Sequence, residues 1–221
     1  MKYICIYEGA IVKTKLLLVD DHAIVRAGFR HLLESESKYE FLEVDSAEEA
    51  CQVYAEYKPD AVIMDLMMPG MGGLEGVRYL NAKDKNAKVL VLSMRDDLAY
   101  VTRATVAGAT GYLTKKSAPG ELARAVSVVI KGQKYLSADV CDLANNEAWD
   151  ADEDKVKSLT EREFEIFCLL AEGKSVVKIS TDLHLSPKTV SNHRTRIMKK
   201  INATNIVELT RLAIRNGLFE A

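Results

Sequence analysis

The chain has 221 residues, of which 48% are hydrophobic and 28% are charged, and its net charge is −2. This length suits one large domain or two small ones, and the apolar fraction is ample for buried cores. The sequence contains no run near the roughly 18 apolar residues of a membrane span, and Glu8, Lys13 and Lys15 break the N-terminal stretch, which makes it a poor signal peptide. We therefore expect a cytoplasmic protein without membrane contact, and the four scattered cysteines fit reduced, mostly buried thiols.

Charge is distributed unevenly along the chain. From Val156 onward eleven Lys/Arg face seven Asp/Glu, a net +4, which leaves nineteen against twenty-five, or −6, for the residues before it. This asymmetry predicts two domains, with any polyanion bound by the second.

The first part of the chain repeats a short β-rich apolar run followed by a helical pattern. The predicted strands lie at 16–20, 39–44, 61–65, 87–93 and 111–115, and predicted helices follow near 22–35, 46–57, 73–82, 96–108 and 119–132. Ser46 and Glu49 have the spacing of a capping box at the start of the second helix. Nearly continuous apolar strands favour a parallel sheet covered on both faces. Five such units predict an α/β, flavodoxin-like, doubly wound five-stranded sheet rather than a barrel.

The residues after this repeat lose its periodicity. We interpret 134–157 as an acidic linker with a short helical piece around 138–145. From Ser158 the pattern is helical throughout, with predicted helices from a capping box at Thr160 and Glu163 to about Ala171, near 175–183, at 187–201 and from about 204 to Asn216. The second domain is therefore predicted to be small and all-α, with four helices.

Polar side chains end the predicted strands of the first domain. Asp20 and Asp21 follow the first strand, Asp65 ends the third, Ser93 the fourth and Lys115 the fifth. Ligands of open parallel sheets bind at the carboxyl ends of the strands. Three converging carboxylates repel one another unless a hard cation such as Mg²⁺ lies among them. A lysine and a hydroxyl beside that cation suit the oxygens of a phosphoryl group.

These motifs resemble the receiver domain of bacterial two-component response regulators, from about Lys13 to Gly132. The resemblance implies that Asp65 is the phosphoacceptor for a sensor histidine kinase, and that Asp20, Asp21, Asp65 and the backbone carbonyl of Met67 hold Mg²⁺. It further implies that Ser93 and Lys115 bind the phosphoryl oxygens. Tyr112 resembles the family's aromatic switch, which swings inward on phosphorylation; the alternative is an exposed tyrosine on a strand.

The chain departs from the receiver pattern in three places. Lys116 follows Lys115 where family members often carry an acidic residue or proline. Met67 and Arg95, which flank the phosphoryl group by likeness, offer no carboxylate or amide to orient an attacking water, so we predict slow self-dephosphorylation. Residues 1–11 precede the usual start of a receiver. Our hypothesis is that Val12 is the natural start and that 1–11 is a start-site artefact; the alternative is an appended segment with its own packing.

The third predicted helix of the second domain has a basic, polar face. Ser186 is a natural N-cap and Pro187 suits the first helical position. The residues of this face are Lys188, Thr189, Ser191, Asn192, Arg194, Thr195, Arg196, Lys199 and Lys200. Such a helix, preceded by a shorter one, fits a helix-turn-helix whose second member enters a DNA major groove. A solvated surface is the simpler reading of the basic face alone.

The tail resembles the LuxR-type DNA-binding domain, through "SPKTVSNH" and "ELTRLAIRNGL". The resemblance makes Ser191, Asn192 and Thr195 the readers of base edges, and the other residues of the basic face contacts to phosphates. His193 is expected to pack rather than read bases. By the same resemblance, the last helix of this domain would pair two DNA-bound domains. A helix that only completes the core is a serious alternative.

Together the two likenesses identify a two-component response regulator of the NarL/FixJ family, similar to the GacA/UvrY branch. They divide the chain into an N-terminal extension (1–11), a receiver (12–133), a linker (134–157) and a DNA-binding domain (158–221). They imply a non-enzymatic, phosphorylated regulator of transcription that dimerises on activation, binds double-stranded DNA and meets RNA polymerase. Two alternatives remain, a phosphatase with Asp65 as nucleophile and a phosphorylation-independent DNA-binding protein. The former needs a substrate cap or acid/base partner, and the latter usually lacks the acidic pair or the lysine.

Overall fold

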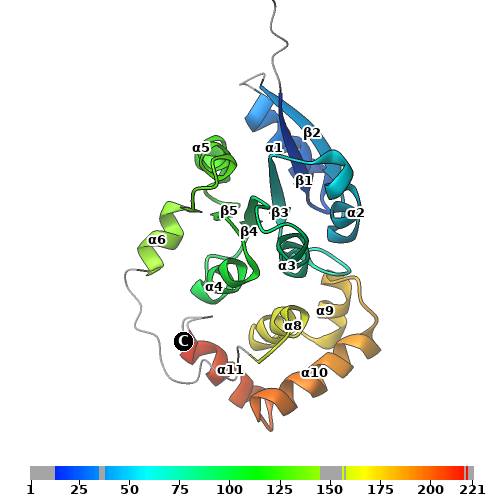
Figure 1. Cartoon of the computed structure of the whole chain (residues 1–221). Helices are drawn as coiled ribbons and strands as arrows, with labels where there is room; N and C mark the ends of the chain where they lie inside the picture. Colours follow the sequence, from blue (N-terminus) through cyan, green and yellow to red (C-terminus); the bar gives the residue numbers. More distant parts are fainter. Residues whose placement is uncertain (1–12, 35–37, 145–155, 157, 217, 219–221) are drawn as a thin grey trace, which may run out of the picture.

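The structure is a computed structural model that describes residues 13–34, 38–144, 156, 158–216 and 218. The hypothesis on residues 1–11 lies outside these ranges. The chain forms an α/β domain above a smaller helical one (Figure 1). The strands of the first domain are β1 (Thr14–Val19), β2 (Tyr39–Val44), β3 (Ala61–Asp65), β4 (Val89–Ser93), β5 (Gly111–Thr114) and β6 (Tyr135–Leu136). Its helices are α1 (Ala23–Glu34), α2 (Ala47–Tyr57), α3 (Gly73–Lys83), α4 (Leu98–Ala107), α5 (Ala118–Ile130) and α6 (Ala138–Ala144).

The strands form one parallel sheet in the order β2-β1-β3-β4-β5-β6. Alternate residues of β1 point to opposite faces: Leu17 and Val19 pack with α2, α3 and α4, whereas Leu16 and Leu18 pack with α1 and α5. All residues of β3 are buried, as expected for a central strand covered on both sides. The predicted doubly wound fold class is confirmed.

A sixth strand extends the five that the sequence predicts. Tyr135 and Leu136 pair with Gly111 and Tyr112 of β5, so the sheet continues past residue 133, the boundary expected for the receiver. A two-residue strand carries no periodicity, which is why the sequence pattern does not show it. The helical piece predicted around 138–145 is present as α6, in the segment interpreted as a linker.

The second domain consists of α8 (Glu161–Ala171), α9 (Val176–Asp182), α10 (Pro187–Ile201) and α11 (Ile206–Arg215). Side chains that accept backbone hydrogen bonds fix each start: Thr160, Ser175, Ser186 and Asn205. The capping box of Thr160 and Glu163 is complete, as predicted. At α2, the side chain of Ser46 accepts a hydrogen bond from the amide of Glu49.

Within the described ranges, no helix has both the length and the apolarity needed to cross a membrane.

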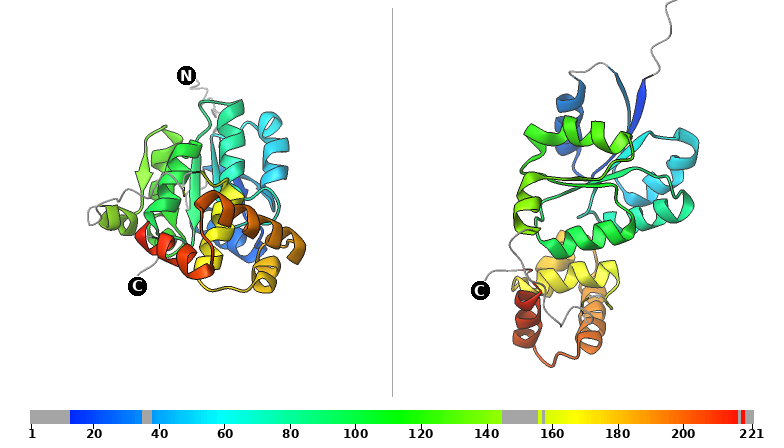
Figure 2. Two further views of the ribbon diagram at one scale, coloured as in Figure 1. Left: turned by 90° about the horizontal axis from the view of Figure 1, so that it is seen from below. Right: turned by 60° about the vertical axis from the view of Figure 1, so that its left-hand side comes forward.

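Helix α8 of the second domain faces the first domain and lies against its helices α3 and α4 (Figures 1 and 2). The ring of Tyr100 on α4 meets that of Phe164 on α8 edge to face, with 4.9 Å between centroids. One apolar cluster runs from the α2–α3–α4 side of the sheet into the core of the helical domain. The two domains are therefore docked through a buried apolar contact, with α10 and α11 farther from the sheet (Figure 2).

Candidate phosphorylation site and nucleic-acid interface

Two buried carboxylates and one lysine meet at the carboxyl edge of the sheet. Asp20 follows β1 and Asp65 ends β3, and each residue is 3% exposed. The ammonium of Lys115, which follows β5, lies 2.8 Å from Oδ2 of Asp20 and 2.9 Å from Oδ2 of Asp65. Helix α3 begins against this site, because a Cβ on Gly73 would lie only 1.8 Å from the carbonyl oxygen of Asp65. Glycine at 73 thus lets the loop after β3 close tightly over the aspartate.

The lysine balances charge that burial makes costly. Burial raises the pKa of Asp65, and the neighbouring Asp20 adds to the rise while Lys115 opposes it. Burial by itself would lower the pKa of Lys115, but Asp65 and Asp20 outweigh it and the pKa is raised. Lys115 therefore stays protonated beside two carboxylates and presents a cation to any anionic group bound at Asp65.

The same carboxylates offer oxygen ligands to a cation. Ligand atoms of Asp20, Asp21, His22 and Asp65 all lie within 4.8 Å of one another. Oδ1 of Asp21 is buried and accepts no hydrogen bond from the described residues, although Nδ1 of His22 lies 2.9 Å away as an ionic contact. A buried, unsatisfied carboxylate oxygen among acidic groups fits a Mg²⁺ site. Sequence reasoning missed His22, whose only signal is its position next to Asp21.

Ser93 and Tyr112 meet at Arg95 in the loop after β4. The hydroxyl of Ser93 is fully buried and accepts a hydrogen bond from the amide of Arg95 at 3.0 Å. The hydroxyl of Tyr112 donates to the carbonyl of Arg95 at 2.7 Å. Tyr112 is 1% exposed, so it is not the exposed strand tyrosine that was the alternative to a switch. Its ring already lies inward in this structure, and its hydrogen bond ties β5 to the loop after Ser93.

The predicted DNA-contacting residues lie together on α10. Of these nine residues, eight are exposed and Thr189 is half-buried. Val190, Ile197 and Ile201 are buried on the opposite side. Lys200 differs from the rest, because its ammonium lies 2.5 Å from Glu163 and 3.3 Å from the carbonyl of Ser158. Lys200 thus also holds α10 to the start of α8.

His193 lies at the edge of this surface and packs rather than projects. Its side chain is half-buried, and burial lowers the pKa of its imidazole. A neutral ring at this position contributes no charge to the basic face, in keeping with the packing role expected for it.

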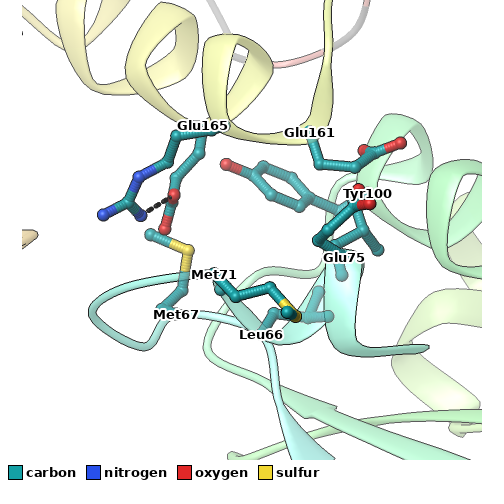
Figure 3. Close-up of a pocket in the computed structure, with 10 residues that line it drawn as sticks. Leu66, Met67, Met71, Glu75, Tyr100, Glu161 and Glu165 are labelled. Atoms are coloured by element: carbon teal, nitrogen blue, oxygen red, sulfur yellow. Dashed lines mark hydrogen bonds and ion pairs between the residues drawn. The ribbon is translucent and has the colours of Figure 1, made fainter. Parts of the chain in front are cut away.

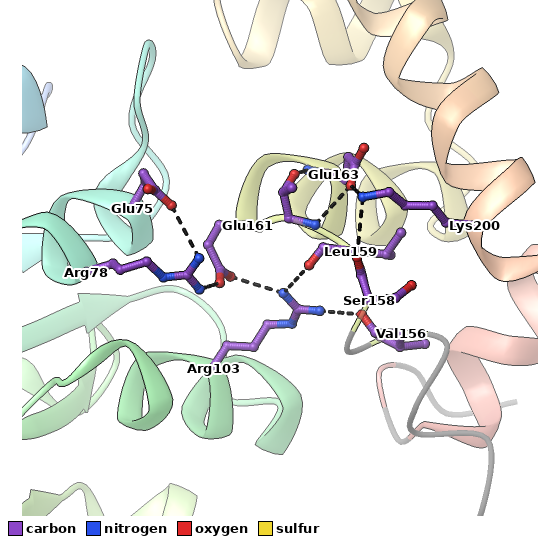
Figure 4. A network of polar contacts seen from close by, with 10 residues as sticks. Glu75, Arg78, Arg103, Val156, Ser158, Leu159, Glu161, Glu163 and Lys200 are labelled. Atoms are coloured by element: carbon purple, nitrogen blue, oxygen red, sulfur yellow. Dashed lines mark hydrogen bonds and ion pairs between the residues drawn. The ribbon is translucent and has the colours of Figure 1, made fainter.

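A polar network joins the two domains beside the apolar contact (Figure 4). Glu161 at the start of α8 pairs with Arg78 of α3 and with Arg103 of α4, the latter at 3.1 Å. Arg103 also donates to the carbonyls of Val156 and Leu159, and its guanidinium lies 3.8 Å from the centre of the Phe164 ring. Sequence reasoning missed this network, because its members lie far apart in the chain and each fits a solvated surface charge.

A second group of contacts brings α8 next to the phosphorylation site. A pocket of about 20 Å³ lies between α8 and the loop after β3, and Met67, Met71, Tyr100 and Glu165 are among its lining residues. Glu165 extends from α8 toward Met67 (Figure 3). The docked helix therefore lies across this pocket from the loop that starts at the candidate phosphoacceptor.

Comparison with known proteins matches both domains. Residues 16–127 match the response regulator receiver domain, and residues 157–213 match the luxR family of bacterial regulatory proteins. The chain is 39% identical over 210 residues to the response regulator UvrY of Escherichia coli K12, covering 93% of this chain and 96% of that protein. It belongs to the NarL/FixJ family of response regulators. The response regulator GacA of Pseudomonas aeruginosa is 38% identical over 94% of this chain and 98% of its own, which confirms the GacA/UvrY branch.

Solved structures of response regulators share this architecture. The RcsB–DNA complex matches with a TM-score of 0.58 and 26% identity, over 92% of this chain and 98% of that one. A LuxR-family response regulator from Aurantimonas matches with a TM-score of 0.57 and 40% identity, over 59% of this chain and 94% of that one. The receiver and the LuxR-type DNA-binding domain of this response regulator are thus established together.

Proposed function

We propose that this response regulator accepts a phosphoryl group on Asp65 from a sensor histidine kinase, and that the modification controls dimerisation and DNA binding. The observation that carries the proposal is the pair of contacts from Lys115 to Asp20 and Asp65 at the sheet edge, 2.8 and 2.9 Å long. Because the ligand is chromosomal DNA, we place the protein in the cytoplasm, with RNA polymerase as a further partner.

In the transfer, a carboxylate oxygen of Asp65 attacks the phosphorus of a phosphohistidine. The new O–P bond forms as the N–P bond breaks, and the electron pair returns to the imidazole of the kinase. Mg²⁺ held by Asp20, Asp21, Asp65 and the carbonyl of Met67 would neutralise charge on the transferring oxygens. Lys115 and the hydroxyl of Ser93 would bind those oxygens in the product.

The acyl phosphate on Asp65 would be long-lived. Neither Met67 nor Arg95 carries a carboxylate or amide that could orient a water for in-line attack. The guanidinium of Arg95 is moreover engaged with Glu172, the C-cap residue of α8. Hydrolysis in seconds on the isolated protein would contradict this expectation.

On α10, the exposed basic face supports DNA binding. Ser191, Asn192 and Thr195 have side chains suited to base edges, and Lys and Arg residues around them suit phosphates. Dimerisation would place two such helices on paired half-sites.

Chemical mapping tests the phosphoacceptor. The full-length chain is incubated with acetyl phosphate and Mg²⁺, reduced with borohydride, which converts an aspartyl phosphate to homoserine, and digested for mass spectrometry. We expect the homoserine only at position 65, and none in Asp65→Ala. Conversion at another aspartate, or none in the wild type, would overturn the proposal.

A phosphorylation-independent DNA-binding regulator is the second candidate function. It is favoured by one observation, the exposure of the α10 face while α8 is docked on an unmodified receiver. The two candidates differ in whether occupancy of Asp65 changes DNA binding.

A further inference from the structure

Glu165 is a buried acid at the contact between the two domains. The residue is 7% exposed, and one carboxylate oxygen, Oε2, accepts a hydrogen bond from Arg162 one turn earlier on α8. The other, Oε1, is buried and accepts no hydrogen bond from any described residue. A buried carboxylate with one unsatisfied oxygen costs free energy when it is charged, so the charged form of Glu165 disfavours the docked state.

The unsatisfied carboxylate faces the loop that follows the candidate phosphoacceptor. Glu165 lines the pocket together with Leu66 and Met67, the two residues that follow Asp65 (Figure 3). The negative charge of Asp65 adds to the rise that burial causes in the pKa of Glu165. The two carboxylates therefore already repel each other through a medium with little water to screen them.

We propose that Glu165 is the charge sensor through which modification of Asp65 releases the DNA-binding domain from the receiver. The inference rests on the proposed function, since it takes an aspartyl phosphate as the signal. With Mg²⁺ held at the site in both states, converting the carboxylate of Asp65, with one negative charge, to an acyl phosphate with about two adds negative charge at this position. The added charge repels the buried carboxylate of Glu165 only while α8 stays docked, so it favours the separated state.

The other charged residues of the interface stabilise the docked state and do not respond to modification of Asp65. Glu161 and Glu172 are each paired with arginines of the receiver, Glu161 with Arg78 and Arg103, and Glu172 with Arg95. Their attractions hold the docked state whether or not Asp65 is modified. Neutralising Glu172 should therefore loosen docking in both states, whereas neutralising Glu165 should loosen it in neither and should remove the response to modification.

The experiment titrates beryllofluoride into the full-length chain at a constant, saturating Mg²⁺ concentration and at pH 8, where Glu165 is ionised. Fluorine NMR measures occupancy at Asp65, and small-angle X-ray scattering, extrapolated to zero concentration, measures domain separation. In the wild type we expect the radius of gyration to rise as Asp65 is occupied. In Glu165→Gln we expect binding to tighten by roughly tenfold and the particle to stay compact at full occupancy.

Two further variants separate a sensor from a merely structural glutamate. Glu165→Asp keeps the charge and should expand as the wild type does. Glu172→Gln should be partly expanded before beryllofluoride is added and should still respond to it. Expansion of occupied Glu165→Gln to the wild-type extent, or an occupied wild type that stays compact, would overturn the sensor. No fluorine signal from the wild type, or an equal one from Asp65→Ala, would overturn the proposed function itself.

Discussion

The guanidinium of Arg95 forms an ion pair with the carboxylate of Glu172, the residue that caps the C-terminus of α8. The backbone of Arg95 meanwhile takes part in two hydrogen bonds, one from its amide to Ser93 and one from Tyr112 to its carbonyl. One residue thus contacts both the machinery around Asp65 and the DNA-binding domain. We therefore expect a movement of Ser93 or Tyr112 to affect the docking of α8 through Arg95.

Loss of the Arg95 side chain should open the docked structure. Arg95 is half-buried and Glu172 lies at the surface, so removing this partly exposed pair should cost docking about 1 kcal/mol, a roughly fivefold rise in the separated fraction. Scattering from Arg95→Ala without beryllofluoride checks this. The matched control is Lys116→Ala, whose pair with Asp96 is exposed and lies within the receiver. Equal compactness of both variants would show that the pair does not hold the domains together.

The Glu165 carboxyl should titrate far above the ordinary range for glutamate. Burial raises its pKa from 4.5 to about 7, with Asp65 adding to the rise and Arg162 opposing it. A raised pKa in the docked state means that docking is strongest below 4.5 and weakens as the pH rises through 7. Carbon NMR of the side-chain carboxyls, assigned with Glu165→Gln, should show a midpoint near 7. A midpoint near 4.5 in the wild type would contradict burial of this carboxyl by docking.

Lys115→Met should make the stability of the receiver depend strongly on Mg²⁺. Without the ammonium, Asp20 and Asp65 face each other buried and unpaired, and by analogy with other broken buried pairs this should cost about 3 kcal/mol. Mg²⁺ should restore much of that loss. Thermal unfolding with Mg²⁺ and with EDTA measures the difference, which we expect to be larger in Lys115→Met than in the wild type. An equal Mg²⁺ response in both would argue against a metal at these carboxylates.

Two substitutions on α10 should distinguish contacts to base edges from contacts to phosphates. Asn192→Ala should cost about 1–3 kcal/mol on specific DNA and little on random DNA. Lys188→Ala should weaken both, and it should reduce the salt dependence of binding by about one ion. Fluorescence anisotropy over a salt series with specific and scrambled duplexes distinguishes the two. A uniform loss for Asn192→Ala would assign it to phosphates instead.

The candidate site could be predicted from the sequence because a parallel sheet gathers the carboxyl ends of its strands. Asp20, Asp65 and Lys115 are far apart in the chain, yet each directly ends or follows an apolar run, and topology alone brings them together. The helix cap at Thr160 could also be predicted, because Thr160 and Glu163 form hydrogen bonds with backbone amides only three residues away.

The contact between the domains could not be predicted in this way. Arg78, Arg103 and Glu161 belong to helices whose exposed faces are expected to carry charge, so nothing local marks them as partners. Tyr100 and Phe164 each fit the core of their own domain by spacing. Docking depends on how two separately folded surfaces match in shape and charge, which a periodic pattern does not encode.

Control of DNA binding by Asp65 is tested most directly by measuring DNA binding of the full-length chain with and without beryllofluoride and Mg²⁺, beside Asp65→Ala. Fragmented genomic DNA serves as the ligand, because bound fragments also identify the targets. We expect tighter specific binding and dimers in the wild type only. Equal binding by the wild type and Asp65→Ala under both conditions would contradict control by Asp65 and leave the phosphorylation-independent regulator as the function.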